Sequence, residues 1–308
     1  MMPNPEKKYD VIIIGGGPAG LSAGIYTARA RLNTLLIEKN AVGGQIINTW
    51  QVENYPGLES ISGIDLTQTM YRQAISFGVN ELYTEVTAVE LNGAQKLVST
   101  SEGDFISGAV IIAGGAERQK YGVPGEVEFT GKGVSYCATC DGAFFKNKAV
   151  MVAGGGDSAI TEALELTKFA SVVTVIHRRD ALRASKILQE KAFAEPKIKF
   201  LWDSVIEKIT GDTMVKQVGV RNLKNGEKSV LDIPGVFISV GFKPNTGYLK
   251  GIIDMDNGGS IITNAKMETS VSGVFAAGDI RSGSIRQLIA AAGDGAVAAI
   301  SAEKYLIA

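Results

Sequence analysis

The segment Val11-Ile12-Ile13-Ile14-Gly15-Gly16-Gly17-Pro18-Ala19-Gly20 decides how the N-terminal part of the chain folds. Its four consecutive apolar residues predict a strand that is buried on both faces of a parallel sheet. Helix-compatible sequence follows the glycines up to about Ala30, and a second strand is expected over 34–37, ending on Glu38. Strand, glycine turn, helix and strand in this order predict a βαβ unit that binds a dinucleotide.

Each glycine of this turn has its own physical role. Gly15 permits the tight turn, Gly17 lets backbone amides approach a pyrophosphate, and Gly20 allows close helix–strand packing. The helix N-terminus then faces the phosphates. Glu38 stands where a carboxylate accepts hydrogen bonds from ribose hydroxyls. A glycine-rich turn in an unrelated sheet is the alternative interpretation. It is disfavoured because such a turn does not require a strand, a helix and an acid in this order.

The pattern occurs a second time further along the chain. An apolar strand is expected over 149–153, followed by Gly154-Gly155-Gly156-Asp157-Ser158-Ala159, a helix, and a strand over 172–176. His177 lies as far from this second turn as Glu38 lies from the first, 23 positions in each case. The chain therefore contains two nucleotide-binding units.

The two units differ in the charge that follows their second strand. The first has Glu38, whereas the second has His177-Arg178-Arg179, with Arg183 a turn further on. A 2′-phosphate needs cationic donors, and guanidinium groups bind it bidentately. We therefore assign NADPH to the second unit and an FAD-type dinucleotide to the first. A solvated pair of surface arginines is the alternative for Arg178 and Arg179.

The only two cysteines of the 308 residues lie in Ser135-Tyr136-Cys137-Ala138-Thr139-Cys140-Asp141. Two thiols at this spacing can close a small disulfide ring and reopen it by exchange with another disulfide. A zinc site needs about four N or S ligands, more than these cysteines and the single histidine supply, so no metal is expected. Buried inert thiols are a second alternative, disfavoured by the polar Thr139 and Asp141. Asp141 is the nearest candidate proton donor, and a helix N-cap or turn acid is a compatible role.

Composition and charge exclude several classes of protein. The length suits two domains, and 45% hydrophobic residues with 37 glycines suit a globular α/β protein. A net charge of −1 provides no basic field for nucleic acid or an anionic membrane. No stretch reaches the roughly 18 apolar residues of a membrane span, and two cysteines give no secreted disulfide framework. A cytoplasmic location is expected.

The order of the motifs predicts the domain organisation. We expect two Rossmann-like three-layer FAD/NAD(P)-binding domains of α/β class, the second inserted into the first. Residues 1–116 and 246–308 form the expected FAD-binding domain, and residues 117–245 the NADPH-binding domain that carries the cysteines. Linkers are predicted at Pro124-Gly125 and around Pro244.

The cysteines precede Gly154 by only 14 positions, so both redox partners of a flavin belong to the inserted domain. The nicotinamide and the disulfide are not expected to lie at the same place against the flavin at the same time. Rotation of this domain is therefore expected, with hinges near 116–124 and 241–247.

Seven motifs together carry a resemblance over essentially the full length: Gly15-x-Gly17-x-x-Gly20, Gly44-Gln45, Glu53-Asn54-x-Pro56-Gly57, Cys137-Ala138-Thr139-Cys140-Asp141, Gly154-x-Gly156-Asp157-Ser158-Ala159, His177-Arg178-Arg179-x-x-x-Arg183 and Gly278-Asp279. They closely resemble those of the bacterial-type, low-molecular-weight NADPH-dependent thioredoxin reductases. The resemblance implies FAD and NADPH as cofactors, thioredoxin as the protein substrate and a homodimer as the working unit.

The resemblance also implies roles for individual residues. Cys140 would be the sulfur nearer the flavin, Cys137 would attack the thioredoxin disulfide, and Asp141 would donate the proton. With the motifs, it places the following at the FAD site: Gly15, Gly17, Pro18, Ala19, Gly20, Glu38, Lys39, Gly44, Gln45, Asn54, Val86, Ala113, Gly114, Asp279, Arg286, Gln287 and Leu288. At the NADPH site it places Gly156, Asp157, Ser158, His177, Arg178, Arg179, Arg183 and Gly241. One departure is Gly114, where family members often carry Thr, so a hydroxyl is missing there.

Other functions stay open on the sequence alone. A flavin-dependent dithiol oxidase is the nearest alternative, and it does not need the arginine cluster; a reductase of another thioredoxin-like protein is also possible. A non-catalytic NADPH sensor is an alternative of a different class, disfavoured by the intact Cys137, Cys140 and Asp141. A glutathione- or lipoamide-type reductase is disfavoured because its disulfide follows the first βαβ unit, where this chain has Gly43-Gly44-Gln45.

Overall fold

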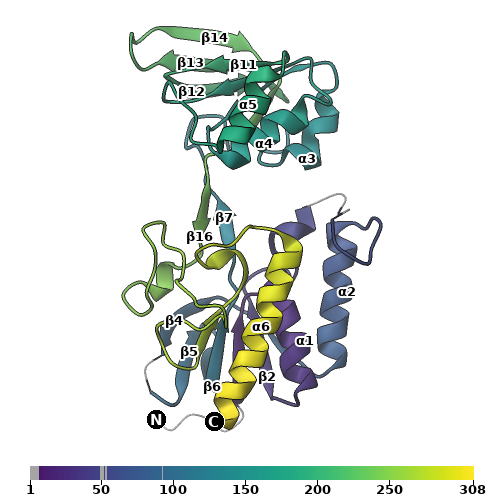
Figure 1. The fold of residues 1–308 in the computed structure, drawn as a ribbon, viewed down its shortest axis with the longest axis vertical. Coiled ribbons are helices and arrows are strands. Elements are labelled where there is room, and N and C mark those ends of the chain that lie inside the picture. Colours follow the sequence, from purple (N-terminus) through teal and green to yellow (C-terminus); the bar gives the residue numbers. More distant parts are fainter. Residues whose placement is uncertain (1–6, 49–51, 53, 92) are drawn as a thin grey trace. The chain divides into compact units, whose positions relative to one another are not determined.

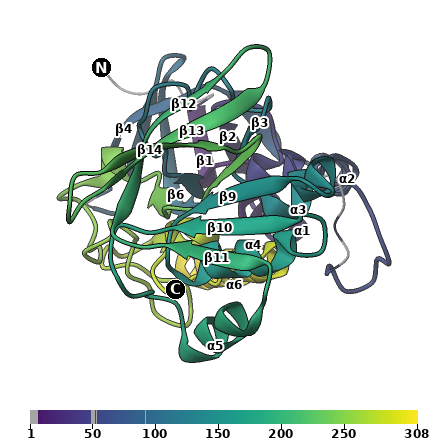
Figure 2. The same cartoon turned by 90° about the horizontal axis from the view of Figure 1, so that it is seen from above.

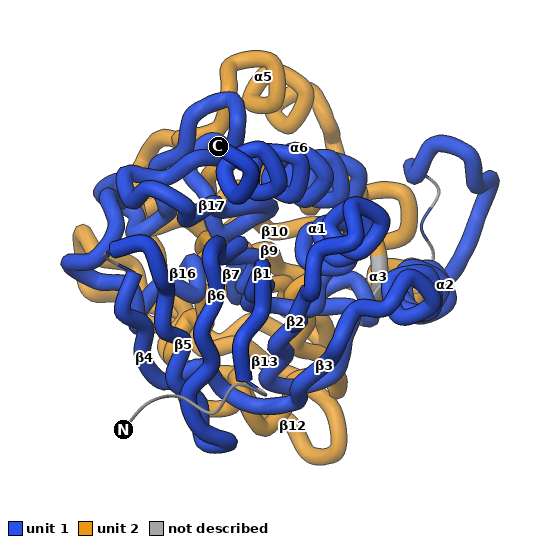
Figure 3. Tube along the Cα trace, turned by 90° about the horizontal axis from the view of Figure 1, so that it is seen from below, with its two compact units in different colours: residues 1–117, 243–308 blue, residues 118–242 orange. Residues whose placement is uncertain are grey.

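The structure is a computed structural model that describes residues 7–48, 52, 54–91 and 93–308. The chain divides into two compact units, with the second inserted into the first (Figure 3). Unit 1 comprises Met1–Glu117 and Lys243–Ala308, and unit 2 comprises Arg118–Phe242.

Unit 1 is built on a sheet of order β3-β2-β1-β6-β5-β4, in which β17 also pairs with β6 (Figure 3). The apolar run of β1 is buried on both faces, because parallel strands lie on either side and other layers cover it. Strands β4 and β5 pair antiparallel, and β5 pairs antiparallel with β6. The strand bounds are β1 (Lys8–Ile14), β2 (Thr34–Glu38), β3 (Asn80–Tyr83), β4 (Val86–Glu90), β5 (Lys96–Thr100), β6 (Gly103–Ile112) and β17 (Val274–Ala276).

Three helices share one apolar core on one face of this sheet: α1 (Pro18–Arg29), α2 (Gly63–Ser76) and α6 (Leu288–Ile307). Helices α1 and α6 lie side by side (Figures 1 and 3). Their close approach requires Gly295, because a Cβ there would lie 2.0 Å from the carbonyl oxygen of Ala19. The other face is covered by the segment that contains Leu249, Ile253 and Ile261. Short 3-10 helices complete the unit: η2 (Gly44–Asn48), η4 (Gly247–Leu249) and η5 (Gly278–Ile280).

Unit 2 has a five-stranded parallel sheet of order β11-β10-β9-β15-β8, of which β9, β10 and β11 are seen side by side in Figure 2. A separate antiparallel sheet, β12-β13-β14, lies in a part of the chain for which the sequence motifs predicted nothing. The bounds are β8 (Val134–Ser135), α3 (Ala138–Asp141), η3 (Gly142–Phe145), β9 (Ala149–Ala153), α4 (Asp157–Leu166), β10 (Val172–Ile176), α5 (Lys186–Ala194), β11 (Ile198–Leu201), β12 (Ser204–Gly211), β13 (Val215–Asn222), β14 (Lys228–Asp232) and β15 (Gly235–Ile238).

The chain passes between the units twice, through β7 (Ala116–Arg118) and β16 (Phe242–Pro244), which pair with each other. The linker predicted at Pro124-Gly125 is wrong. These residues pack inside unit 2, where the amide of Ile209 donates to the Pro124 carbonyl at 2.9 Å. A Cβ on Gly125 would lie 2.0 Å from the Ile209 carbonyl oxygen, so this glycine serves close packing rather than flexibility. Within the residues described, no helix is long and apolar enough to cross a membrane.

Candidate functional site

The first glycine turn leaves open space above the N-terminus of α1. Gly15 has φ +109°, and a Cβ there would lie 2.4 Å from the Ala113 carbonyl oxygen, so only glycine fits. At Gly20 a Cβ would lie 1.8 Å from the Gly15 carbonyl oxygen, which explains the close packing of helix on turn. Gly17 is the N-cap of α1, and a Cβ there would meet only Gly44 Cα, at 3.9 Å. Pro18 is the first helical residue and has no N–H of its own. The other backbone amides at this helix N-terminus are not covered by side chains and can receive a pyrophosphate.

Glu38 ends β2, and one of its two carboxylate oxygens contacts the glycine turn. The Gly16 amide donates to Glu38 Oε2 at 2.7 Å, and the Asn40 amide donates to Oε1 at 2.9 Å. Each oxygen can accept more than one hydrogen bond, so the carboxylate is oriented and can still receive ribose hydroxyls. Lys39 forms an exposed ion pair with Glu85 at 2.7 Å.

Segments that are distant in sequence meet beside the first turn. Gly44 begins η2 and is followed by Gln45. The Cα of Gly44 lies against Gly17. The Asn54 side-chain amide donates to Gln287 Oε1 at 3.2 Å, which joins two candidate residues that are 233 positions apart. Glu53 of the same motif lies outside the described residues.

The remaining candidate residues of unit 1 lie at strand and helix ends. Val86 begins β4 and packs against the apolar core, while Leu288 begins α6. Ala113 follows β6 directly and is buried. The Gly114 carbonyl accepts a hydrogen bond from the Asn245 side chain at 2.9 Å, so this position is held through its backbone.

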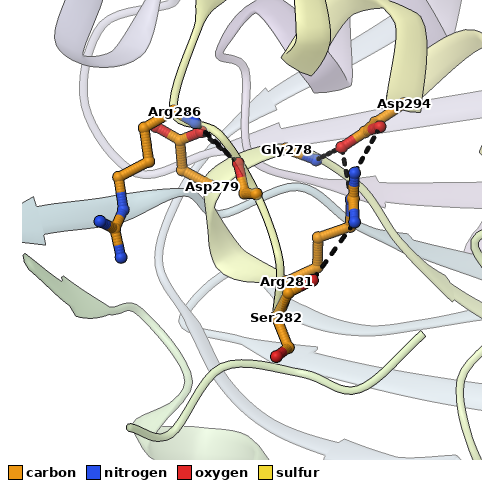
Figure 4. A network of polar contacts seen from close by, with 7 residues as sticks. Gly278, Asp279, Arg281, Ser282, Arg286 and Asp294 are labelled. Atoms are coloured by element: carbon orange, nitrogen blue, oxygen red, sulfur yellow. Dashed lines mark hydrogen bonds and ion pairs between the residues drawn. The ribbon is translucent and has the colours of Figure 1, made fainter. Parts of the chain in front are cut away.

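Asp279 lies on η5, in a loop held by polar contacts (Figure 4). Ser284 Oγ donates to Asp279 Oδ1 at 2.9 Å, and the Arg286 amide donates to Ser284 Oγ at 3.2 Å. Burial raises the pKa of Asp279, and the Ser284 hydrogen bond and the Arg286 charge oppose this rise. Arg286 has φ +54°, so the loop holds it in the left-handed region, and its guanidinium extends away from Arg281 and Asp294 (Figure 4).

A buried ion pair fixes the same loop, and the sequence motifs did not indicate it. Asp294 Oδ2 accepts from Arg281 Nε at 2.5 Å, and Oδ1 accepts from Arg281 Nη2 at 2.9 Å. Asp294 Oδ2 also accepts from the Gly278 amide at 3.1 Å (Figure 4). The side chains are only 19% and 10% exposed. The one available signal was a lone acid in an otherwise small-residue stretch of the C-terminal helix.

Asp294→Ala is expected to lower the free energy of unfolding by about 3 kcal/mol, because Arg281 stays largely buried without its partner. Chemical denaturation measures this loss. Glu207→Ala is the control: it removes a carboxylate that pairs with both Arg221 and Lys228, whose side chains are 40% and 68% exposed. It is expected to cost clearly less stability than Asp294→Ala, because exposed ion pairs are solvated and contribute little. Equal losses for the two variants would contradict a special role for the buried pair.

The second glycine turn is built like the first. Gly154 has φ +150°, and a Cβ there would lie 2.2 Å from the Ser239 carbonyl oxygen. Gly156 is the N-cap of α4, and a Cβ there would meet nothing within 4 Å. Asp157 and Ser158 are the first helical residues. The turn therefore again presents an open helix N-terminus to an anion.

The arginine-bearing loop after β10 folds back onto this turn. The Arg183 amide donates to the Gly155 carbonyl at 2.7 Å, and the Ser185 amide donates to Asp157 Oδ1 at 2.6 Å. Arg178, Arg179 and Arg183 are exposed. Over the described residues, no carboxylate forms an ion pair with any of the three. Three cationic groups therefore stand near one open helix N-terminus.

The side chain of His177 is buried, unlike those of the three arginines. A Cβ on Gly155 would lie 2.5 Å from Nδ1 of His177, so the imidazole packs directly under the turn. Burial lowers the pKa of His177, and the charges of Arg183 and Arg178 lower it further. His177 Nε2 has no hydrogen-bond partner within the described structure. Gly241, also a candidate, has φ +120° and accepts from the Gln119 amide at 2.9 Å beside β7.

The cysteine segment follows β8, and Cys137 is disulfide-bonded. The only other cysteine of the sequence is Cys140, whose side chain lies outside what the structure describes. Ser135 Oγ donates to Asp141 Oδ2 at 2.6 Å and accepts from the Cys137 amide at 3.0 Å. Ala138, between the cysteines, is buried in the core of unit 2. Asp141 therefore lies beside the cysteine turn, and Ser135 is an added member of the site.

A second network anchors the residue before Cys137. Tyr136 Oη donates to Glu126 Oε1 at 2.7 Å, and Glu126 also accepts from the amides of Tyr121 and Gly122, at 2.8 and 2.6 Å. Burial acts to raise the pKa of Glu126, but these hydrogen bonds outweigh it and leave the pKa below its usual range. Burial and the contact with Glu126 raise the pKa of Tyr136 to about 12.

A carboxyl group with a raised pKa, that of Glu162, lies near β7, one of the strands that connect the units. Glu162 of α4 pairs with Arg118 of β7 at 3.2 Å. Burial raises the pKa of Glu162 to about 7, against the opposing charge of Arg118. Neither this pair nor the Glu126 network follows from a sequence motif, because single buried carboxylates have no characteristic spacing.

Comparisons with known proteins show which family this chain belongs to. Residues 9–295 match the pyridine nucleotide-disulphide oxidoreductase family. The chain is 47% identical to a thioredoxin reductase of Listeria monocytogenes over 307 residues, covering 99% of this chain and 96% of that protein. It is 49% identical to a thioredoxin reductase of Bacillus subtilis over 302 residues, covering 98% and 96%.

Solved structures give the same result. The crystal structure of Lactococcus lactis thioredoxin reductase in its FR conformation matches with a TM-score of 0.79 and 47% identity, covering 97% of this chain and 99% of that one. This likeness and the parallel strands at the centre of the main sheet of each unit confirm the predicted α/β fold with two Rossmann-like units. The chain belongs to the pyridine nucleotide-disulphide oxidoreductase family and, within it, to the thioredoxin reductases.

Proposed function

We propose that this thioredoxin reductase passes electrons from NADPH, through FAD and the Cys137–Cys140 pair, to the disulfide of oxidised thioredoxin. One observation carries the proposal: unit 2 combines a disulfide-bonded Cys137 with an open, arginine-flanked nucleotide turn. Unit 1 supplies a second open turn, with the carboxylate of Glu38 in place of arginines.

The residues of unit 1 suit FAD. A Cβ on Gly17 would point into the space that a pyrophosphate needs, and Glu38 is already oriented toward the turn. Asn54, Gln287 and the loop of Asp279 supply further polar groups. When bound, the flavin accepts a hydride from the nicotinamide and delivers two electrons to a disulfide.

The residues of unit 2 suit NADPH. Gly156 leaves the helix N-terminus open for the pyrophosphate, and Arg178, Arg179 and Arg183 provide the charge for the 2′-phosphate. In this proposal His177 packs against Gly155 and supports the turn, and it does not contact the phosphate.

The cysteines carry the exchange with thioredoxin. The Cys137 thiolate attacks a sulfur of the thioredoxin disulfide, and one thioredoxin sulfur leaves as a thiolate. Cys140 then attacks Cys137, which releases the second thioredoxin thiolate and restores the disulfide of the reductase. When that disulfide is next reduced, Asp141 gives a proton to the departing thiolate.

Rotation of one unit is part of the proposal. The cysteine turn and the NADPH turn both belong to unit 2, so each must reach the flavin in its own step. The paired connector strands β7 and β16 are the only two crossings between the units, which makes them the natural hinge.

We also propose a homodimer in the cytoplasm. Helix α6 leaves Ile289, Val297, Ile300 and Ile307 exposed on one side, which a second copy of the chain could cover. Cytoplasmic thiol pools are kept reduced, which suits a dithiol that must be regenerated.

Anaerobic titration with NADPH tests the whole scheme. Purified protein carrying FAD is expected to lose its flavin absorbance on addition of NADPH and to regain it when oxidised thioredoxin is added. Recovery with O2 but not with thioredoxin would favour a dithiol oxidase. A protein that is colourless and takes up no FAD would contradict the proposal.

A further inference from the structure

The hydroxyl of Ser135 lies between the backbone of Cys137 and the carboxylate of Asp141. Its proton goes to Asp141 Oδ2 at 2.6 Å, and its oxygen accepts from the Cys137 amide at 3.0 Å. The Cys137 carbonyl oxygen lies further away, at 3.3 Å. Ser135 is 5% exposed, so water does not compete freely for these contacts. One buried hydroxyl thus joins the first cysteine to the acid that follows the second.

The position of this hydroxyl is set by the sheet. Ser135 is the last residue of β8, where it pairs in register with Phe237 of β15. The turn that carries Asp141 is set independently by the core, since Ala138 is 1% exposed. The Asp141 amide donates to the Cys137 carbonyl at 3.2 Å, which holds its backbone but leaves the carboxylate free to rotate. In the described structure Ser135 is the side chain that fixes that rotation.

We propose that Ser135 is a positioning residue for proton transfer at the cysteine pair, an inference that rests on the proposed function. Reduction of the reductase disulfide takes up two electrons, which the proposed function draws from NADPH: the S–S bond breaks, both sulfurs become thiolates, and one of them takes the proton of the Asp141 carboxyl group. An S–H bond forms, an O–H bond breaks, and Asp141 becomes a carboxylate. Ser135 stabilises that carboxylate by an O–H···O⁻ hydrogen bond, of the stronger charge-assisted kind, and fixes its orientation.

A double-mutant cycle tests the inference. Ser135→Ala is expected to lower kcat for thioredoxin reduction about tenfold, and Asp141→Asn about 100-fold or more. The KM values for NADPH and thioredoxin are expected to stay unchanged, because neither group binds the substrates. In the Asp141→Asn background, Ser135→Ala is expected to change kcat less than about twofold. A further tenfold loss in that background, or a loss that appears in KM, would overturn the proposal.

Two more variants separate positioning from folding. Ser204→Ala removes another buried hydroxyl of unit 2, one that donates to the Trp202 carbonyl at 2.7 Å, and it should leave kcat unchanged. Ser135→Thr keeps the hydroxyl and should retain kcat within about threefold of the starting protein. A Ser135→Thr variant that binds FAD but is as slow as Asp141→Asn would contradict the inference. If the unaltered protein fails to reduce thioredoxin, the proposed function fails; if it succeeds while the cycle is additive, only the role of Ser135 fails.

Discussion

Cys137→Ser is expected to abolish thioredoxin reduction while NADPH still bleaches the flavin. Serine is a far weaker nucleophile than a cysteine thiolate and cannot form the mixed disulfide, so electrons would reach the flavin but not leave it through this route. Stopped-flow absorbance under anaerobic conditions measures bleaching, and an insulin-coupled thioredoxin assay measures turnover.

Thr139→Ala provides the matched control for this variant. Thr139 lies between the cysteines and is exposed, so removing its hydroxyl tests whether any change in the turn disturbs turnover. Turnover close to that of the unaltered protein is expected. Thioredoxin reduction by Cys137→Ser at an undiminished rate would show that electrons leave by another path and would remove the central role given to the cysteine pair.

The double variant Arg178→Ala, Arg179→Ala is expected to raise KM for NADPH about 100-fold or more and to change KM for NADH less than about threefold. A hydrogen bond to a charged group contributes about 1.5–3 kcal/mol, and 1.4 kcal/mol corresponds to tenfold in affinity. Only NADPH carries the 2′-phosphate, so only its binding should suffer. Steady-state kinetics with both nucleotides, at fixed ionic strength, measure the difference.

Arg221→Ala is the control for the arginine variant. Arg221 is also in unit 2, but it lies on the antiparallel sheet and forms an ion pair with Glu207. Its replacement by Ala therefore removes a positive charge that does not belong to the glycine turn. It should leave the preference for NADPH intact. Equal weakening of NADPH and NADH by the double variant would remove the reason for placing the 2′-phosphate beside Arg178 and Arg179.

Several parts of the fold were predictable because backbone geometry demanded particular residues. Gly15 and Gly154 both have positive φ and contacts that exclude a Cβ, so they could be identified from the sequence. The antiparallel sheet β12-β13-β14 was missed because its strands carry no motif and lack a regular apolar alternation: the register of β12 shifts between Ile206 and Lys208, and β14 is mostly exposed. Pro124-Gly125 was misjudged because a glycine that permits close packing has the same sequence signature as one that permits flexibility.

The sequence by itself determined the family, the two glycine turns and the places of the arginine cluster and the cysteine pair in the chain. Each needs a fixed residue type at a fixed spacing: glycine where a Cβ would collide, arginine for a phosphate, paired thiols for exchange. Only the tertiary structure decided which ordinary polar side chains meet, such as Arg281 with Asp294 and Ser135 with Asp141. Serine, aspartate and arginine can each be satisfied by many partners, so their pairing depends on which surfaces the folded backbone brings within hydrogen-bond distance.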